Sequence, residues 1–416
     1  MRKQMGLLIL EKHLIWSGPN AEGGISFYYY YDAITWVVGV LVLAGVAWFL
    51  VTRYLRALAL RRRPRRVNHN LLKRVVKIKS ELSRRFLPLG VSNNIHAVGI
   101  GMLAGAAEQY CIQVFVNDAA QELWAGSGAT PLPGNYRGVP LVLIEMPAAG
   151  FLSAAGLPIR DRQEVIVGGI SGANSNLTGQ SGTIGYFCTR KSRFSRLKET
   201  HLLSNSHVFA DLQKATVDEG DLIMQPSPGE PGNNRPIGTL VNFSALKFEG
   251  DVHEPNHVDA AIAKLWSTQQ HKPLLPFIGA VKGYVNKEDM RVGEAARKFG
   301  RTTGYTEGRI FSIYLDIWIR YDRTRQSAFF ENQLLVEPAP AFQKFVAKGD
   351  SGSLLVDENQ HAIGLIFGGM SEAPETTHPL PKSGAATINK PQRIEGYGVA
   401  NPITDVMERL KIELIV

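Results

Sequence analysis

The sequence predicts a mainly β protein, and three observations support this prediction. Short apolar runs separated by Gly, Asn, Asp and Pro recur after Pro158 without intervening helical patterns, which is typical of a barrel or sandwich. The 41 glycines and 22 prolines are spread along the chain, as many tight turns require. With 416 residues, of which 44% are hydrophobic and 20% charged, the chain can form two or three domains with buried cores.

The apolar runs give the expected positions of the strands after residue 158. A terminal helix is expected at about 402–414, because Asn401 can cap it, Pro402 fits its first position, and no Gly or Pro follows. The expected strands lie at 164–170, 182–189, 200–204, 221–225, 258–265, 296–299, 309–315, 333–337, 352–356 and 361–367.

The segment 33–51, which follows an N-terminal segment 1–32, reads as a transmembrane helix. It has nineteen residues without a charge, and at about 1.5 Å per residue it matches a hydrocarbon core of about 30 Å. Seven arginines follow it within about twenty residues, whereas Lys12 precedes it. The positive-inside rule then predicts a single-pass membrane protein whose C-terminal region faces the cytoplasm.

Between the predicted span and the strand-rich region, the sequence suggests two smaller parts. The segment 53–90 contains apolar residues at near-helical spacing among lysines and arginines, which indicates an amphipathic basic helix. Such a helix could bind anionic lipid through residues 53–85, or it could be a solvated linker. Residues 91–160 read as a small α/β module, a spacer or regulatory unit, with strands expected at 97–102, 111–116 and 139–146 and a loop at 126–134.

The net charge of +9 is concentrated in one segment. Between Arg53 and Arg85 there are thirteen Lys or Arg and one acid, which leaves a charge of −3 on the rest of the chain. A nucleic-acid partner is therefore not expected. The two cysteines, Cys111 and Cys188, fall in different predicted parts, so we expect two buried free thiols and no disulfide framework.

Three separated segments carry the residues that amide hydrolysis needs. This reaction requires a nucleophile, a base for its proton, a partner that holds the base, and donors for the developing oxyanion. Ser351 lies between glycines in KGDSGS, His207 follows an apolar strand in LLSNSHV, and Asp259 begins another in VDAAIA. Order and context together predict a catalytic triad. Asp251 and Glu254 are competing acids for its third position.

From about residue 165 to the C-terminus, the chain resembles chymotrypsin-fold serine proteases. The resemblance lies in LLSNSHVFA, VDAAIA and KGDSGS. More narrowly, GQSGTIGYF, GDLIMQP, GRTTGYTEG and GLIFGG resemble bacterial trypsin-like peptidases that carry a small N-terminal module. The resemblance implies a protease domain over 161–416, with two six-stranded antiparallel β-barrels at about 165–270 and 275–400 and the triad in the cleft between them.

The resemblance also implies a role for each site residue. Ser351 would be the nucleophile, His207 the general base and then acid, and Asp259 the residue that fixes the imidazole tautomer. The backbone N–H groups of Gly349 and Ser351 would form the oxyanion hole.

The specificity pocket follows from the resemblance as well. Phe345, six residues before Ser351, falls where the family's pocket has its floor, and Phe367 and Gly368 would line it. Since no acid occupies the floor, we expect cleavage after a small or medium apolar residue. A peptide-library profile dominated by Lys or Arg would refute this expectation.

Two further sequence patterns resemble functional sites. The segment 166–169 resembles the N-terminus created when animal trypsinogens are cut, and Asp350 is the residue type that would receive its ammonium group, but Glu and Val precede the segment instead of Lys or Arg. We therefore expect no activating cut. His253, His257 and Asp259 could suggest a metal site, but a proline between the two histidines prevents a helix that would align them. No metal and no cofactor is expected.

The sequence thus predicts a serine endopeptidase that acts on protein or peptide substrates through an acyl-enzyme and is tethered to a membrane. The alternative is a catalytically inactive protease-fold module that recruits a partner at the membrane. A lipase-type hydrolase is disfavoured, because no Gly-x-Ser-x-Gly elbow precedes a helix. The sequence does not indicate an oligomeric state.

Overall fold

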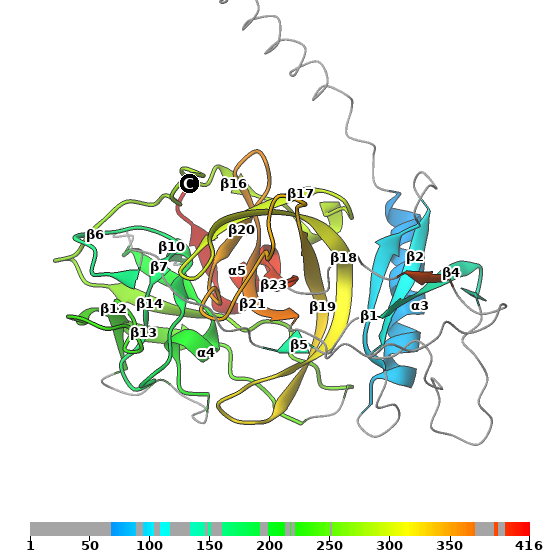
Figure 1. The fold of residues 1–416 in the computed structure, drawn as a ribbon, viewed down its shortest axis with the longest axis horizontal. Helices are drawn as coiled ribbons and strands as arrows, with labels where there is room; N and C mark the ends of the chain where they lie inside the picture. Colours follow the sequence, from blue (N-terminus) through cyan, green and yellow to red (C-terminus); the bar gives the residue numbers. More distant parts are fainter. Residues whose placement is uncertain are drawn as a thin grey trace, which may run out of the picture. The chain divides into compact units, whose positions relative to one another are not determined.

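The fold was examined in a computed structural model, which describes residues 68–88, 95–103, 109–116, 134–145, 149–150, 160–191, 199–212, 217, 221–249, 252–370, 387–389 and 396–416. All of them belong to one compact unit, residues 67–416. They are mainly β, with few helices (Figure 1). The predicted fold class is confirmed at this level.

Helix α3 (His69–Phe86) lies within the segment 53–90, for which an amphipathic basic helix was predicted. The side chain of Asn68 accepts a hydrogen bond from the N–H of Leu71 at 3.1 Å, which caps the helix. The apolar face packs on strands β1 (Ile95–Met102) and β2 (Tyr110–Val116). The apolar face of the helix is therefore buried in protein, and lipid binding by the basic segment stays a prediction. The buried apolar residues are Leu72, Val75, Ile78, Leu82 and Phe86.

The strands packed on α3 lie in the segment for which a small α/β module was predicted. Strand β1 pairs antiparallel with β2, and β2 pairs parallel with β4 (Val139–Glu145). Two short strands, β3 (Asn135–Tyr136) and β22 (Thr387–Asn389), also pair with β4. The predicted loop at 126–134 lies almost wholly outside the described residues, and the predicted module boundary near residue 160 stays a prediction.

A seven-stranded sheet carries the first half of the strand-rich region. Its order is β24-β10-β11-β14-β13-β12-β8. The strands are β8 (Ala173–Asn174), β10 (Tyr186–Arg190), β11 (His201–Ser204), β12 (Leu222–Gln225), β13 (Arg235–Phe243), β14 (Ala261–Leu265) and β24 (Ile412–Leu414).

A thirteen-stranded sheet carries the second half and continues into the module, in the order β17-β20-β21-β23-β19-β18-β1-β2-β4-β22. Its strands outside the module are β5 (Ala149–Gly150), β16 (Gly283–Tyr284), β17 (Ala295–Gly300), β18 (Gly304–Arg320), β19 (Ser327–Pro338), β20 (Leu354–Val356), β21 (His361–Met370) and β23 (Gly398–Pro402). The remaining short elements are β6 (Val165–Ile166), β7 (Ile170–Ser171), β9 (Thr183–Ile184), β15 (Gln270–His271) and the 3-10 helix η2 (Lys287–Asp289).

The two separate six-stranded barrels predicted from the resemblance are not distinct in the structure. The reason is the length of β18, which has 17 residues. Its first part pairs with β17, and its last part pairs with β1 of the module, with Ala97 opposite Ile317 and Val98 opposite Asp316. The second sheet is therefore continuous with the module sheet.

The C-terminal helix is shorter than predicted. Helix α5 (Ile403–Leu410) ends at Lys411, which has a left-handed backbone with φ of 55°. The chain then reverses into β24, which pairs with β10. Asn401 does not cap the helix, because its side-chain oxygen accepts a hydrogen bond from the backbone N–H of Asp259 at 3.0 Å.

The prediction of a single-pass membrane protein is contradicted. No helix in the described part of the chain is long and apolar enough to cross a bilayer. Residues 33–51, on which the prediction depended, lie outside the described residues, as does the segment 53–67 that follows them. Single-pass localisation, with the orientation derived from it, is therefore unsupported.

Three buried apolar clusters hold the unit together. The first joins the seven-stranded sheet to α5, the second joins α3 and the module strands to β18, β19 and β21, and the third lies along β18, β19 and β21. Cys188 lies in the first cluster and Cys111 in the third, and both thiols are free and buried, which confirms the expectation for them.

Candidate active site

His207 lies in the single-turn helix α4 (Ser206–Phe209), directly after strand β11. The residues before it fix the turn to strand β14. The Asn205 side-chain amide donates to the carbonyl of Asp259 at 2.7 Å, and the Ser206 hydroxyl lies 2.9 Å from the carbonyl of Ala260. The turn is thereby bound to the segment that carries the predicted acid.

The carboxylate of Asp259 is fully buried and accepts two hydrogen bonds from His207. The ring Nδ1 of His207 lies 2.5 Å from Oδ2, and the backbone N–H of His207 lies 3.2 Å from Oδ1. Because Nδ1 is bound to the acid, a proton transfer by this ring would use Nε2. The structure therefore brings these two predicted residues together.

The competing acids are placed differently. Glu254 is exposed and forms an ion pair with Lys247 at 3.0 Å. Asp251 lies outside the described residues.

Ser351 lies in a tight, mostly buried loop before β20, with an exposed fraction of 8%. The flanking glycines Gly349 and Gly352 have φ of 99° and 96°, a conformation that L-residues avoid. A Cβ atom on Gly352 would lie 2.3 Å from Oγ of Ser204 on β11. The serine loop therefore runs against the strand that leads into His207.

The described contacts do not complete the predicted triad. They include no hydrogen bond between the hydroxyl of Ser351 and the ring of His207. Catalytic hydrogen bonds are often long in proteins without substrate and tighten when it binds. The catalytic roles of the three residues stay predictions.

The three carbonyl groups that precede Ser351 are held by neighbouring hydroxyls. Lys348 O accepts from Thr302 at 2.6 Å, Gly349 O from Thr183 at 2.8 Å, and Asp350 O from Ser353 at 2.5 Å. Within the described residues, the N–H groups of Gly349 and Ser351 have no acceptor. Two unpaired donors in one rigid loop are what binding of an oxyanion requires.

Asp350 anchors the same loop through its fully buried side chain. It accepts hydrogen bonds from the backbone N–H groups of Thr302, Thr303 and Ala347 and from the hydroxyl of Thr303, at 2.7 to 3.1 Å. Lys298 Nζ lies 3.2 Å from Oδ2, and both side chains are fully buried. Burial lowers the pKa of Lys298, and the charge of Asp350 opposes that shift.

These contacts bear on the segment that resembles an activation site. Ile166 lies in β6, which pairs with β15. The carboxylate of Asp350 is already paired with an internal lysine, so it needs no new N-terminal ammonium group.

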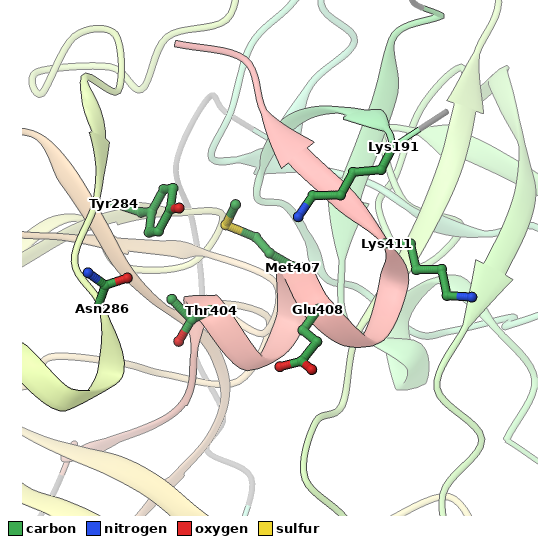
Figure 2. A pocket seen from close by; sticks show the side chains of 7 residues that line it. All are labelled: Lys191, Tyr284, Asn286, Thr404, Met407, Glu408 and Lys411. Carbon is green, nitrogen blue, oxygen red and sulfur yellow. The ribbon is translucent and has the colours of Figure 1, made fainter. Parts of the chain in front are cut away.

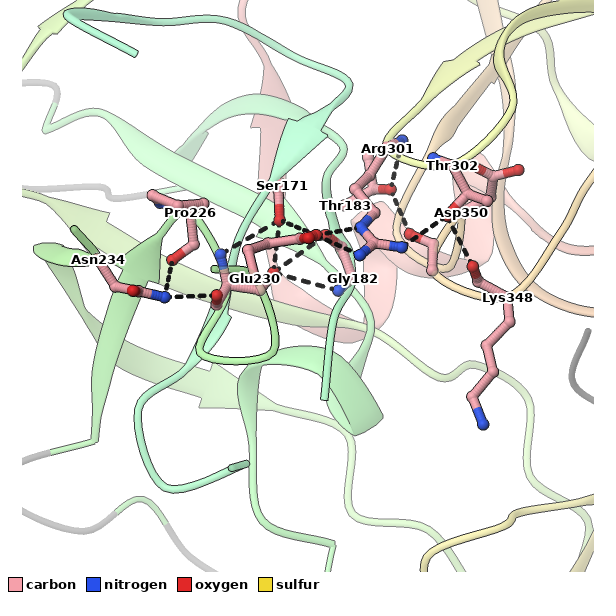
Figure 3. A network of polar contacts seen from close by, with 12 residues as sticks. Ser171, Gly182, Thr183, Pro226, Glu230, Asn234, Arg301, Thr302, Lys348 and Asp350 are labelled. Carbon is pink, nitrogen blue, oxygen red and sulfur yellow. Dashed lines mark hydrogen bonds and ion pairs between the residues drawn. The ribbon is translucent and has the colours of Figure 1, made fainter. Parts of the chain in front are cut away.

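A second polar network braces the loop through residues of the first half of the strand-rich region (Figure 3). Nε and Nη2 of Arg301 bind the carboxylate of Glu230, and Glu230 also accepts from the hydroxyl of Ser171 at 3.1 Å. The backbone N–H of Arg301 donates to Thr183 Oγ1 at 3.1 Å, and its Nη1 donates to Thr302 Oγ1 at 3.0 Å. Arg301 thus binds both threonines that hold the carbonyls of Lys348 and Gly349. Arg301 lies in the motif GRTTGYTEG, from which no role for its side chain was predicted.

The residues of the predicted specificity pocket lie in the interior. Phe345 is fully buried and contacts Lys298, whose Nζ lies 5.9 Å from the ring centroid. Phe367 is fully buried against Phe330, with ring centroids 4.7 Å apart, and Gly368 follows it on β21. The two phenylalanines belong to different clusters. The pocket and its preference for an apolar residue stay predictions.

A separate hollow of about 490 Å³ lies beside helix α5 (Figure 2). None of the predicted triad residues lines it. Its lining residues are Lys191, Tyr284, Asn286, Thr404, Met407, Glu408 and Lys411.

No protein-family model matches the chain, and no curated protein matches it significantly. Similar solved structures include a glutamic acid-specific serine protease that uses a histidine triad in substrate binding, with 15% identity, a TM-score of 0.36, and 60% of this chain and 100% of that chain covered. Thermobifida fusca protease A has 18% identity and a TM-score of 0.37, with 61% and 99% covered. Nocardiopsis protease has 18% identity and a TM-score of 0.36, with 60% and 99% covered.

These structural neighbours are trypsin/chymotrypsin-like serine proteases. Their identities of 15 to 18% and TM-scores below 0.5 support no conclusion about the substrate or mechanism of this chain.

Proposed function

We propose that this chain is a serine endopeptidase that hydrolyses peptide bonds of protein substrates through an acyl-enzyme. One observation carries the proposal. The imidazole of His207 is bound to the buried carboxylate of Asp259. His207 also directly follows strand β11, and the glycine-flanked loop of Ser351 runs against that strand. The unpaired N–H groups of Gly349 and Ser351 add the hydrogen-bond donors that stabilise the oxyanion formed during acyl transfer.

In the proposed mechanism, the hydroxyl oxygen of Ser351 attacks the scissile carbonyl carbon while Nε2 of His207 takes the hydroxyl proton. The tetrahedral oxyanion accepts hydrogen bonds from the N–H groups of Gly349 and Ser351. The imidazolium, stabilised by Asp259, then gives its proton to the leaving amine, and the C–N bond breaks. Water, deprotonated by His207, attacks the resulting ester and releases the acid and free Ser351.

The alternative function is a catalytically inactive protease-fold module. Such a module would bind a protein partner without cleaving it.

Reaction with a fluorophosphonate separates the two candidates. The Ser351 oxygen of a competent triad attacks phosphorus and expels fluoride, so the wild-type chain is expected to gain one covalent label on Ser351, located by peptide mass spectrometry. Ser351→Ala and His207→Ala are expected to reduce labelling at least about 100-fold.

A matched control is Ser327→Ala on strand β19, which is expected to label at the wild-type rate. If the folded wild-type chain neither reacts with the fluorophosphonate nor cleaves casein, the proposed protease function is contradicted and the inactive binding module remains as the candidate.

A further inference from the structure

Tyr321 directly follows strand β18 and points its hydroxyl at the predicted acid. The phenol donates a hydrogen bond to Oδ2 of Asp259 at 2.8 Å. This is the same oxygen that contacts Nδ1 of His207. None of the sequence motifs includes this tyrosine, which lies 62 residues from Asp259 along the chain.

The surrounding structure leaves the phenol little freedom. Its backbone closes the turn between β18 and β19, since the N–H of Tyr321 donates to Gln326 O and its carbonyl accepts from Arg325, both at 2.9 Å. The ring is 2% exposed. It lies edge-on to the rings of His207 and Phe248, with centroids 5.6 and 5.5 Å apart.

The importance of this hydroxyl follows from the other donors to the Asp259 carboxylate. Among the described residues, both of them belong to His207 itself, through its ring and its backbone N–H. A buried carboxylate that lacks donors is costly and tends to take up a proton. Asp259 has to orient His207, so the donors from His207 cannot fix the carboxylate independently. Tyr321 provides a donor to this carboxylate that is independent of His207.

We propose that Tyr321 is a positioning residue of the catalytic site, which holds the Asp259 carboxylate in the rotation that meets Nδ1 of His207. This rests on the proposed function. The phenol restrains rotation of the Asp259 carboxylate group and draws part of the negative charge of Oδ2 toward itself. Its ring also limits the swing of the imidazole.

The phenol remains a donor over the working pH range. Burial and the neighbouring charge of Asp259 raise the pKa of Tyr321 well above its ordinary value. The proton therefore stays on the phenol oxygen, and the hydrogen bond keeps its direction from Tyr321 to Asp259.

The test is Tyr321→Phe in the full chain, which keeps the ring and removes the hydroxyl. With a peptide substrate, kcat is expected to fall about 10-fold and KM to stay within about twofold, because the lost contact acts on the reacting groups and not on substrate binding. In proton NMR, the hydrogen-bonded Nδ1 proton of His207 is expected to move downfield, because more negative charge then faces it on Oδ2.

Tyr397→Phe is the matched control. Tyr397 is a second buried tyrosine whose hydroxyl binds a carboxylate, that of Glu337 at 3.4 Å. Its loss is expected to leave both kcat and the His207 proton resonance unchanged.

The outcomes separate this inference from the function on which it rests. An unchanged kcat and an unmoved His207 resonance in Tyr321→Phe would overturn the positioning role while Ser351 still labels. If the wild-type chain neither labels nor hydrolyses peptides, the proposed function fails, and the NMR signal alone decides whether Tyr321 orients the Asp259 and His207 pair. A loss confined to KM would also count against the role.

Discussion

The two buried aspartates of the site are stabilised in different ways, and the difference fits different tasks. Asp350 is paired with Lys298 and holds four further donors. Asp259 contacts Tyr321 and His207 and no lysine or arginine within the described residues. The charge of Asp350 is thus neutralised by Lys298, and the Asp350 side chain stabilises the serine loop. The charge of Asp259 remains available to stabilise an imidazolium.

Removing the cation beside Asp350 is expected to destabilise the serine loop. In Lys298→Met, a fully buried carboxylate would lose its ion-pair partner, and breaking such a pair costs about 3 to 5 kcal/mol of unfolding free energy. Fluorophosphonate labelling of Ser351 is expected to slow as well, because Asp350 holds the loop. Urea unfolding and the labelling rate measure the two effects.

Lys348→Met is the control for this prediction. Lys348 belongs to the same loop, but its ion pair with Asp322 is about half exposed, and such pairs contribute less than about 1 kcal/mol. If the two variants unfold at the same urea concentration, Lys298 does not stabilise the loop in this way.

The sequence could indicate one half of the site and not the other. His207, Asp259 and Ser351 were predicted because each lies in a local pattern of strand, turn and glycine. Tyr321 was not predicted, because its hydroxyl binds a residue 62 positions away. Arg301 lies in the motif GRTTGYTEG, but the motif did not indicate its contact with Glu230, 71 positions away. Contacts between such distant positions leave no local pattern, so the folded chain is needed to reveal them.

At the scale of elements, strand predictions succeeded where the apolar pattern is regular and failed where it is broken. Strands β11 and β21 match the predicted ranges 200–204 and 361–367 closely. Strand β13 was missed, because Pro236 and Gly238 interrupt it. Strand β18 was predicted to end at residue 315, but three register shifts along its pairing with β19 break the alternation while the strand continues to Arg320.

The extra length of β18 creates the contact between module and second sheet, and a buried ion pair secures it. Lys79 of α3 binds Asp316 of β18 at 2.7 Å, and both side chains are at most 1% exposed. Lys79→Met is expected to lower the unfolding free energy by about 3 kcal/mol, because it leaves the charge of Asp316 buried without a cation. Chemical unfolding followed by tryptophan fluorescence measures the loss.

Lys77→Met is the matched control on the same helix. Its side chain is exposed, and exposed substitutions of this kind change stability by about 0.5 kcal/mol or less. Equal losses in the two variants would show that the buried pair contributes nothing specific.

At the scale of the whole molecule, the module and the strand-rich region share one apolar core. The second cluster contains Leu72 of α3 and Ile112 of β2 together with Phe345 and Ile366 of the larger region. The sequence predicted two separate parts, because apolar periodicity shows that a segment has a buried face but not what covers it. The same limit applies to α3, because its sequence pattern alone does not show whether strands or lipid cover its apolar face.

A shared core predicts that the two parts unfold together, and the two cysteines can report on this. Burial raises the pKa of the Cys111 thiol to about 11 and raises that of Cys188 further, so neither thiol reacts appreciably in the native chain. With iodoacetamide at pH 8, we expect Cys111 in β2 and Cys188 in β10 to become reactive at the same urea concentration, read separately by peptide mass spectrometry.

Lys79→Met sharpens this experiment, because it weakens the contact between module and second sheet without touching the seven-stranded sheet that contains Cys188. In that variant, Cys111 is expected to become reactive at a lower urea concentration than Cys188. If the wild-type chain already showed this separation, the module would open independently, and the predicted boundary near residue 160 would divide two folding units. If the variant still exposed both thiols together, the buried pair would not be what couples the two parts, and the apolar cluster alone would have to hold them.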